Sequence, residues 1–469
     1  MITSIRFDDA LPAFAALVQQ EWGASAITEN IFLRDVTGRL TFVVLNESYS
    51  TENRTTLASK ATAALGSYVD GDGFAVATPD ELFDDRLKNI TKARKIHLNS
   101  SIFSGEVLVV DRRMVGADWL RDIAPSAPPP IRLVFASIKG GVGRSTALCV
   151  LAAHLAAQGR RVLAIDMDLE APGLGNMLLP DETLPTFGLL DYLVEQSFGP
   201  LDDQFYADMV GSSWLGGGRG RVDVVPAIGQ CSLSNPANVL AKIARAYLDG
   251  GESSGADDLS MEPPSFMDHM RALIDRLANP LRYDVILIDA RAGLHETTAA
   301  AVVGLGAEVL FFGLDQPQTF AGYELLFAHL ATLPVDSNDD WRNRLRFIQA
   351  KAPESPAMRD KFSQDMGALM RKHLWPSIPS AVNQINLAPL KDTFEVEWAE
   401  DAQSEIVPVD DDDKPVPIIA ILDNNRFSSF DPSTDRDSLV ERAYSATFGD
   451  LLVAATAMVD ASVAKGQES

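Results

Sequence analysis

The feature that most constrains the fold is a glycine-rich loop between an apolar run and a helical segment. Ile131 to Ser137 (IRLVFAS) predicts a strand buried on both faces, and Thr146 to Gln158 predicts a helix that Gly159 ends. Glycines let the intervening backbone curl so that its N–H groups point inward, and the helix N-terminus adds its dipole. This combination predicts a phosphate-binding loop.

The loop itself reads Ser137-Ile-Lys-Gly-Gly-Val-Gly-Arg-Ser-Thr146. Ser145 begins the helix, where its hydroxyl can bind Mg²⁺. Arg144 stands where the common form of such a loop has lysine; it keeps the charge and adds a bidentate fork, but it is bulkier. The nucleotide-binding residues that we expect are Lys139, Gly140, Gly141, Val142, Gly143, Arg144, Ser145 and Thr146.

Strands and helices alternate after this loop. The further strands that we expect are Arg161–Ile165, Asp284–Ile288, Glu308–Phe312, Leu345–Gln349 and Ile418–Leu422. Such alternation predicts an α/β domain with a doubly wound, mostly parallel sheet.

Carboxylates follow two of these strands. Asp166 and Asp168 come at the end of one strand, and Asp289 directly follows another. A phosphoryl-transfer site needs carboxylates at strand ends to hold Mg²⁺ and to orient the attacking water. The alternative for Asp166 and Asp168 is that they cap a helix or shape a turn.

The pattern K-G-G-x-G-[KR]-[ST] from Lys139 resembles the deviant Walker A loop of the MinD/ParA family of P-loop ATPases, and the apolar run before Asp289 is similar to a Walker B strand. The resemblance is clear from Ile131 to roughly Leu325. It implies ATP and Mg²⁺ as cofactors, with Lys139 reaching across a homodimer to the nucleotide of the other copy. By the same resemblance Lys139 and Asp168 are catalytic, Asp168 by positioning water, and the metal site comprises Ser145, Asp166 and Asp289.

Two positions after Asp289 are expected to form a switch. Gly293 fits the family's flexible switch glycine, whereas Arg291 departs from the usual D-x-P-x-G pattern. Arg291 is either a phosphate sensor or a structural ion-pair partner. The 121 residues from Asp168 to Asp289 exceed one crossover, so we expect insertions near residues 176–265.

The chain is expected to have two domains. Residues 1–125 predict a small α+β domain that recognises a protein partner, residues 126–130 a proline-rich linker, and residues 131–469 the ATPase domain. In the first domain we expect helices at Leu11–Gln20 and Arg54–Tyr68, a hairpin of Asn30–Leu33 with Leu40–Leu45, and a strand at Glu106–Val110. A basic cluster of Arg86, Lys88, Lys92, Arg94 and Lys95 is either a solvated helix face or a site for an acidic partner or nucleic acid.

Charge and composition narrow the function further. With 65 acidic and 40 basic residues the formal charge is -25, which disfavours binding to nucleic acid and to anionic lipid. Two cysteines exclude a disulfide framework and a cysteine-built cluster. No signal peptide or long uninterrupted apolar run is apparent, so we expect a cytoplasmic protein with no membrane contact, and a core helix at Phe448–Val459.

These inferences favour an ATP-hydrolysing switch that dimerises with ATP and regulates a protein partner, with bacterial defence against phage as one setting. Turnover is expected to be slow and stimulated by the partner. The alternatives are a non-hydrolysing ATP-binding scaffold, a DNA-partitioning type of ATPase and a small-molecule kinase. The choice between ATP and GTP stays open.

Overall fold

The computed structural model describes residues 5–45, 48–71, 73–216, 220–247, 264–375 and 418–468. It divides into two compact units, an N-terminal unit of residues 1–121 with 249–265 and a C-terminal unit that holds the rest. The segment expected to be a linker belongs to the C-terminal unit. Ala124 and Ala127 donate backbone hydrogen bonds to Val303 and Gly306 at 2.8 and 2.9 Å, so the division at Arg121 precedes the expected one.

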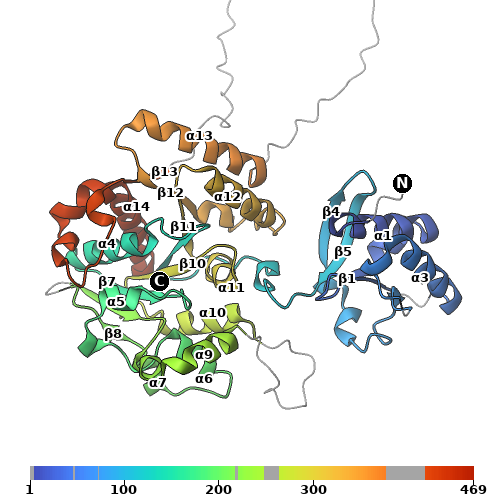
Figure 1. Cartoon of the computed structure of the whole chain (residues 1–469), viewed down its shortest axis with the longest axis horizontal. Helices are drawn as coiled ribbons and strands as arrows, with labels where there is room; N and C mark the ends of the chain where they lie inside the picture. Colours follow the sequence, from blue (N-terminus) through green and yellow to red (C-terminus); the bar gives the residue numbers. More distant parts are fainter. Residues whose placement is uncertain are drawn as a thin grey trace, which may run out of the picture. The chain divides into compact units, whose positions relative to one another are not determined.

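The N-terminal unit is built on a mixed five-stranded sheet in the order β3-β2-β1-β5-β4, with helices α1 and α3 packed together (Figure 1). Its elements are α1 Phe7–Trp22, α2 Ala24–Glu29, β1 Ile31–Arg34, β2 Leu40–Val43, α3 Thr51–Leu65, β3 Val76–Ala77, β4 Arg94–Asn99 and β5 Ser104–Asp111. Strands β1 and β2 pair antiparallel, which confirms the expected hairpin. Phe14, Phe32 and Phe42 form the centre of its core.

The basic cluster of this unit does not lie on an α-helix. Arg86 and Lys88 belong to a short 3₁₀ turn, η2 (Asp85–Lys88), whereas Arg94 and Lys95 begin strand β4. The expectation of a solvated helix face is therefore wrong, because turns and an edge strand carry these charges.

The C-terminal unit has an eight-stranded sheet in the order β13-β12-β11-β6-β10-β7-β9-β8. The strands are β6 Ile131–Ser137, β7 Arg161–Asp166, β8 Gly211–Ser212, β9 Arg221–Val225, β10 Val285–Ala292, β11 Glu308–Gly313, β12 Leu345–Ala352 and β13 Ile418–Leu422. All neighbours pair in parallel except β8 with β9. The predicted α/β architecture with a mostly parallel, doubly wound sheet is confirmed.

Helices cover both faces of this sheet (Figure 1). Helices α4 and α14 pack on one face, around Leu133 and Leu287. Helix α12 packs on the other face, where the ring centroids of Tyr323 and Phe311 are 5.5 Å apart. The helices are α4 Arg144–Ala157, α5 Leu174–Leu178, α6 Leu189–Glu195, α7 Asp203–Ala207, α8 Gln230–Ser234, α9 Val239–Ala246, α10 Phe266–Leu277, α11 Glu296–Ala299, α12 Pro317–Leu330, α13 Pro356–His373 and α14 Glu441–Glu468.

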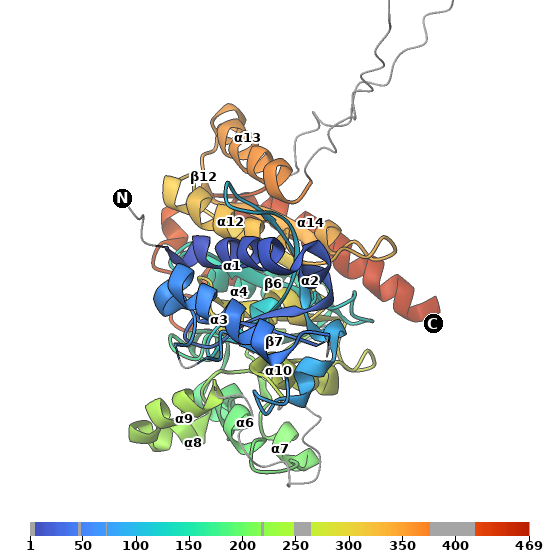
Figure 2. The same ribbon diagram turned by 90° about the vertical axis from the view of Figure 1, so that its right-hand side faces the viewer.

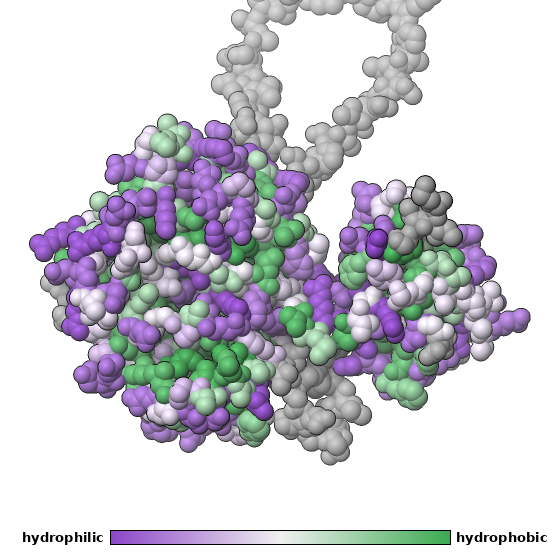
Figure 3. Space-filling model, in the orientation of Figure 1, coloured by the Kyte–Doolittle hydropathy of each residue, from purple (hydrophilic) through white to green (hydrophobic). Residues whose placement is uncertain are grey.

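The C-terminal helix α14 runs along the C-terminal unit and ends at the C-terminus of the described chain (Figure 2). Phe448, Leu451 and Val459 are buried against the sheet and α4, which confirms the expected core helix. Among the described residues, Glu441–Gly466 is the one helix whose length and apolar composition would allow it to cross a membrane. Hydrophilic residues cover most of the visible surface, with an apolar area near α6 and β8 (Figure 3).

Candidate functional site

The strand order brings three predicted site segments together. Strand β10 lies between β6, which leads into the glycine-rich loop, and β7, which ends at Asp166. Asp289 in β10 pairs in register with Phe135 in β6 and with Asp166 in β7. Because the carboxyl ends of parallel strands share one edge of a sheet, the loop and both aspartates lie at this edge.

The loop keeps its curled shape through glycines and two hydrogen bonds. Gly141 and Gly143 have φ of +74° and +89°, a region that other L-residues adopt only with strain. The hydroxyl of Ser137 donates to the carbonyl of Lys139 at 2.8 Å. The N–H of Gly293 donates to the carbonyl of Ser137 at 2.8 Å, so the predicted switch glycine contacts the start of the loop.

Asp289 receives two side chains from the loop. The Ser145 hydroxyl donates to Oδ2 of Asp289, and Nε of Arg144 lies 3.9 Å from Oδ1. Oδ1 is buried and accepts no hydrogen bond from the described residues, and Nη1 of Arg144 is likewise buried without an acceptor among them. Since such polar atoms ordinarily find partners, both point to a site that is completed by a ligand.

Asp166 is buried and shapes the chain after β7. Its carboxylate accepts backbone hydrogen bonds from Asp168 and Gly173, both at 3.1 Å, and from Leu174 at 3.0 Å. Burial, together with the nearby Asp289, raises the pKa of Asp166 to about 7. Burial also raises the pKa of Asp289 to about 6, although Arg144 and Ser145 oppose the shift.

Asp168 and Arg291 lie in the two loops that follow these strands. The half-buried Asp168 accepts a hydrogen bond from the N–H of Ala171 at 3.1 Å. Arg291 donates to the carboxylate of Glu170, so in this structure it is an ion-pair partner. Glu170 is not among the site residues expected from the sequence. The feature that could have indicated it is an acidic side chain two positions after Asp168.

Lys139 is exposed at the start of the loop. Its Nζ lies 3.4 Å from Oε1 of Gln316, the residue that directly precedes α12. An exposed ammonium in contact with one side-chain amide remains available to another molecule.

A narrow hollow of about 50 Å³ lies beside the loop. Gly143 and Thr146 line it from the loop, and Asp423, Asn424 and Phe427 line it from the segment after β13. From the sequence alone, two loops that follow strands are the ones expected to hold the base and the ribose of a nucleotide, Gly313–Gln318 and Asp423–Asn425, and Phe427 lies outside both. The other loop considered for this role contains Asp315 and Pro317, which line a different hollow, between α12 and α13.

Comparison with known proteins gives one family match, over residues 133–181, to the CobQ/CobB/MinD/ParA nucleotide binding domain. No curated protein sequence matches the chain. Similar solved structures include the MinD cell division protein of Aquifex aeolicus, at 15% identity over 70% of this chain and 97% of that one, with a TM-score of 0.41. A ParA family ATPase from Chlorobium tepidum is 20% identical over 51% and 81% of the two chains, with a TM-score of 0.35. The septum site-determining protein MinD of Pyrococcus horikoshii, complexed with Mg-ADP, is 20% identical over 49% and 76%, with a TM-score of 0.32.

Proposed function

We propose that this chain, a MinD/ParA-like P-loop protein, is a Mg²⁺-dependent ATPase that acts as a molecular switch through an ATP-dependent homodimer. The observation that carries the proposal is the contact of Asp289 with both Ser145 and Arg144. It joins a loop shaped for phosphate to the carboxylate that a metal-assisted phosphoryl transfer requires.

The residues at this edge of the sheet fit a magnesium ion. The hydroxyl of Ser145 and the carboxylate of Asp289 are oxygen ligands of the kind Mg²⁺ prefers, and Oδ1 of Asp289 lacks a hydrogen bond from the described residues. No group of three or more His, Cys, Asp or Glu side chains in the described residues could hold a metal. Mg²⁺ here would therefore depend on phosphate oxygens and water as well. When bound, it would neutralise charge on the phosphates.

The other residues take roles that follow from their positions. The loop N–H groups from Gly140 to Thr146 hold the phosphates, and Arg144 adds a positive charge beside them. Asp166 fixes the turn that presents Asp168, and Asp168 orients the attacking water. Lys139, exposed at the edge of the site, reaches the nucleotide of the second copy.

The N-terminal unit would serve as the module that recognises a protein partner, with antiphage defence as one setting. A second candidate, a non-hydrolysing scaffold, is favoured by two departures from the hydrolytic pattern. Arg144 takes the usual lysine position, and Arg291 is held by Glu170. The negative charge of the chain makes a DNA-partitioning role the weaker option.

The test is the mass in solution of Asp168→Ala with and without ATP, alongside ATP and GTP turnover by the wild type. We expect the variant to bind ATP, to stop hydrolysis and to double in mass. Glu182→Ala, which removes an exposed carboxylate elsewhere in the C-terminal unit, is the matched control. An unchanged mass would overturn the dimeric switch. Tight binding without turnover by the wild type would support the scaffold, and no binding would overturn both.

A further inference from the structure

Tyr247 packs against the loop that follows β10, and the proposed function does not use it. It directly follows α9, in the part of the chain where the sequence predicts insertions. Its ring lies edge-on to that of His295, with the centroids 4.9 Å apart. The ring of Phe266, which begins α10, lies 5.7 Å from it. These contacts hold the ring of Tyr247 beside the loop that also carries Arg291.

The hydroxyl of Tyr247 is buried without a hydrogen bond to any described residue. The charges of Glu170 and Arg291 both act on this hydroxyl, so it lies beside the ion pair that these two residues form. Burial and the charge of Glu170 raise the pKa of Tyr247 to about 12, although Arg291 opposes the shift. The hydroxyl therefore keeps its proton at neutral pH and can donate a hydrogen bond to a carboxylate.

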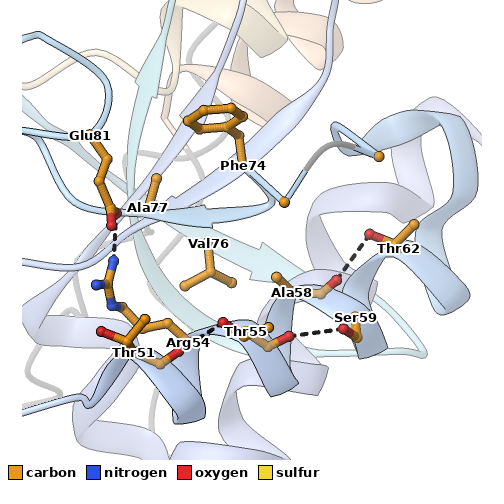
Figure 4. Close-up of a pocket in the computed structure, with 12 residues that line it drawn as sticks. Thr51, Arg54, Thr55, Ala58, Ser59, Thr62, Phe74, Val76, Ala77 and Glu81 are labelled. Atoms are coloured by element: carbon orange, nitrogen blue, oxygen red, sulfur yellow. Dashed lines mark hydrogen bonds and ion pairs between the residues drawn. The ribbon is translucent and has the colours of Figure 1, made fainter.

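The hydroxyls that line a hollow of the N-terminal unit show the contrast (Figure 4). This hollow measures about 610 Å³ and lies between α3 and β3. The hydroxyls of Thr55 and Ser59 each donate to a carbonyl of their own helix at 2.9 Å, and Arg54 pairs with Glu81 at 2.5 Å. These polar groups are satisfied within the chain, whereas a buried hydroxyl with no such bond calls for a partner in another state of the molecule.

The side chain of Arg291 can leave Glu170 while its backbone stays fixed. The hydroxyl of Thr298 donates to the carbonyl of Arg291 at 3.0 Å. The next residue, Ala292, pairs in register with Ser137 at the start of the phosphate loop. The side chains of Arg291 and Glu170 are 26% and 37% exposed, and an ion pair of this kind contributes little to stability. A phosphate group at the loop is a stronger partner for a guanidinium.

Departure of Arg291 would leave Glu170 without its cation, close to a second carboxylate. The charge of Asp168 also acts on Tyr247, so both carboxylates lie around one hydroxyl. A carboxylate that loses its partner in partly buried surroundings is costly, and a hydrogen bond from a neutral donor offsets part of that cost.

We propose that Tyr247 is a positioning residue of the nucleotide site: when Arg291 turns from Glu170 to the terminal phosphate of ATP, the Tyr247 hydroxyl becomes the donor to Glu170. The inference rests on the proposed function, because it requires a nucleotide at the phosphate loop. ADP lacks the terminal phosphate and leaves the ion pair in place. Tyr247 and Glu170 therefore determine how strongly the site prefers ATP over ADP.

Titration calorimetry of the full chain with Mg²⁺ tests the proposal, using ADP and the non-hydrolysable ATP analogue AMPPNP. Tyr247→Phe keeps the ring contacts and removes the hydroxyl, so we expect affinity for AMPPNP to fall roughly tenfold while affinity for ADP is unchanged. Glu170→Gln removes the charge that competes for Arg291, so AMPPNP should bind more tightly, again without a change for ADP. Adding Tyr247→Phe to Glu170→Gln should have no further effect, because the carboxylate that needs the hydroxyl is gone.

Tyr444→Phe is the matched control. The hydroxyl of Tyr444 lies 3.5 Å from Nδ1 of His154, in the last turn of α4 and so at the end remote from the phosphate loop. This variant should bind both nucleotides as the wild type does. Thermal unfolding of each variant checks that the C-terminal unit is folded.

The outcomes separate the two proposals. Equal losses for AMPPNP and ADP in Tyr247→Phe would give Tyr247 a role in the fold alone and would overturn the inference. Unchanged AMPPNP affinity in that variant, or additive effects in the double variant, would overturn it as well. A preference for AMPPNP that depends on Tyr247, without ATP turnover by the wild type, would overturn the ATPase and keep the inference. Absence of nucleotide binding by the wild type would overturn both.

Discussion

Asp166 and Asp289 are direct register partners on the adjacent parallel strands β7 and β10, and both side chains are buried. Burial, together with the nearby carboxylate of Asp289, raises the pKa of Asp166, and burial also raises the pKa of Asp289. Two ionised carboxylates at this edge of the sheet are therefore unfavourable until a cation lies beside them. Arg144 supplies part of this compensation within the chain, and a bound metal would supply more.

Replacing Asp289 by Asn is expected to stabilise the fold while abolishing metal-dependent turnover. The folded pKa of Asp289, about 6, exceeds its ordinary value of 3.8, so the folded protein holds this proton more tightly than the unfolded chain. Stability is therefore lost as pH rises from about 4 to about 6, by up to about 3 kcal/mol, and the loss persists above that range. Unfolding by urea at about pH 5 and pH 8 should show a larger gain for the variant at the higher pH. An equal gain at both would contradict this account.

Replacing Gly143 by Ala is expected to destabilise the C-terminal unit by about 1–2 kcal/mol, because its φ of +89° disfavours a side chain. A Cβ added at Gly143 would meet no atom within 4 Å, so backbone strain is the cause of the expected destabilisation. Gly140 is the matched control, since its backbone lies outside the positive-φ region and its Cβ also meets open space. The urea midpoints of the two alanine variants should differ; identical midpoints would rule out strain in the loop.

Arg144→Ala should weaken ATP binding by roughly tenfold to a hundredfold, because it removes the buried cation beside the phosphates. Arg144→Lys keeps the charge and should bind within several-fold of the wild type, although it loses the fork. Titration calorimetry with ATP and Mg²⁺ measures both. If the alanine variant bound as tightly as the wild type, Arg144 would have no role in phosphate binding.

Lys139→Ala should prevent the ATP-dependent increase in mass and lower turnover by about tenfold or more, while one copy still binds nucleotide. The reason is that the Lys139 side chain is exposed and its ammonium has one hydrogen-bond partner among the described residues, the amide of Gln316, which leaves it available to the second copy. Lys361→Ala, which breaks a surface pair with Asp365 at 2.5 Å, is the control. Light scattering and a phosphate-release assay give the two readouts. A dimer that persisted in Lys139→Ala would place this residue outside the interface.

Segments whose structure depends on neighbours in sequence were predicted well. Strand β6 has the bounds expected for it, and α4 begins two residues earlier than expected. The glycines of the loop and Asp289 at its strand end were also recognisable, because local backbone geometry and hydrophobic runs are encoded in contiguous residues. The strands β3 and β8 were missed because two residues are too few to show a period. Helix α10 was missed although its buried residues Phe266, Met270 and Leu273 recur at helical spacing.

The contacts between segments that are distant in the sequence could not be predicted from contiguous residues. That β10 lies between β6 and β7, and that Arg291 pairs with Glu170, are results of packing. The amino-acid sequence alone determined the phosphate loop and its accompanying carboxylates, because those depend on short-range backbone chemistry. The tertiary structure alone decided which charges meet, because strand order and burial set the distances at which charges act.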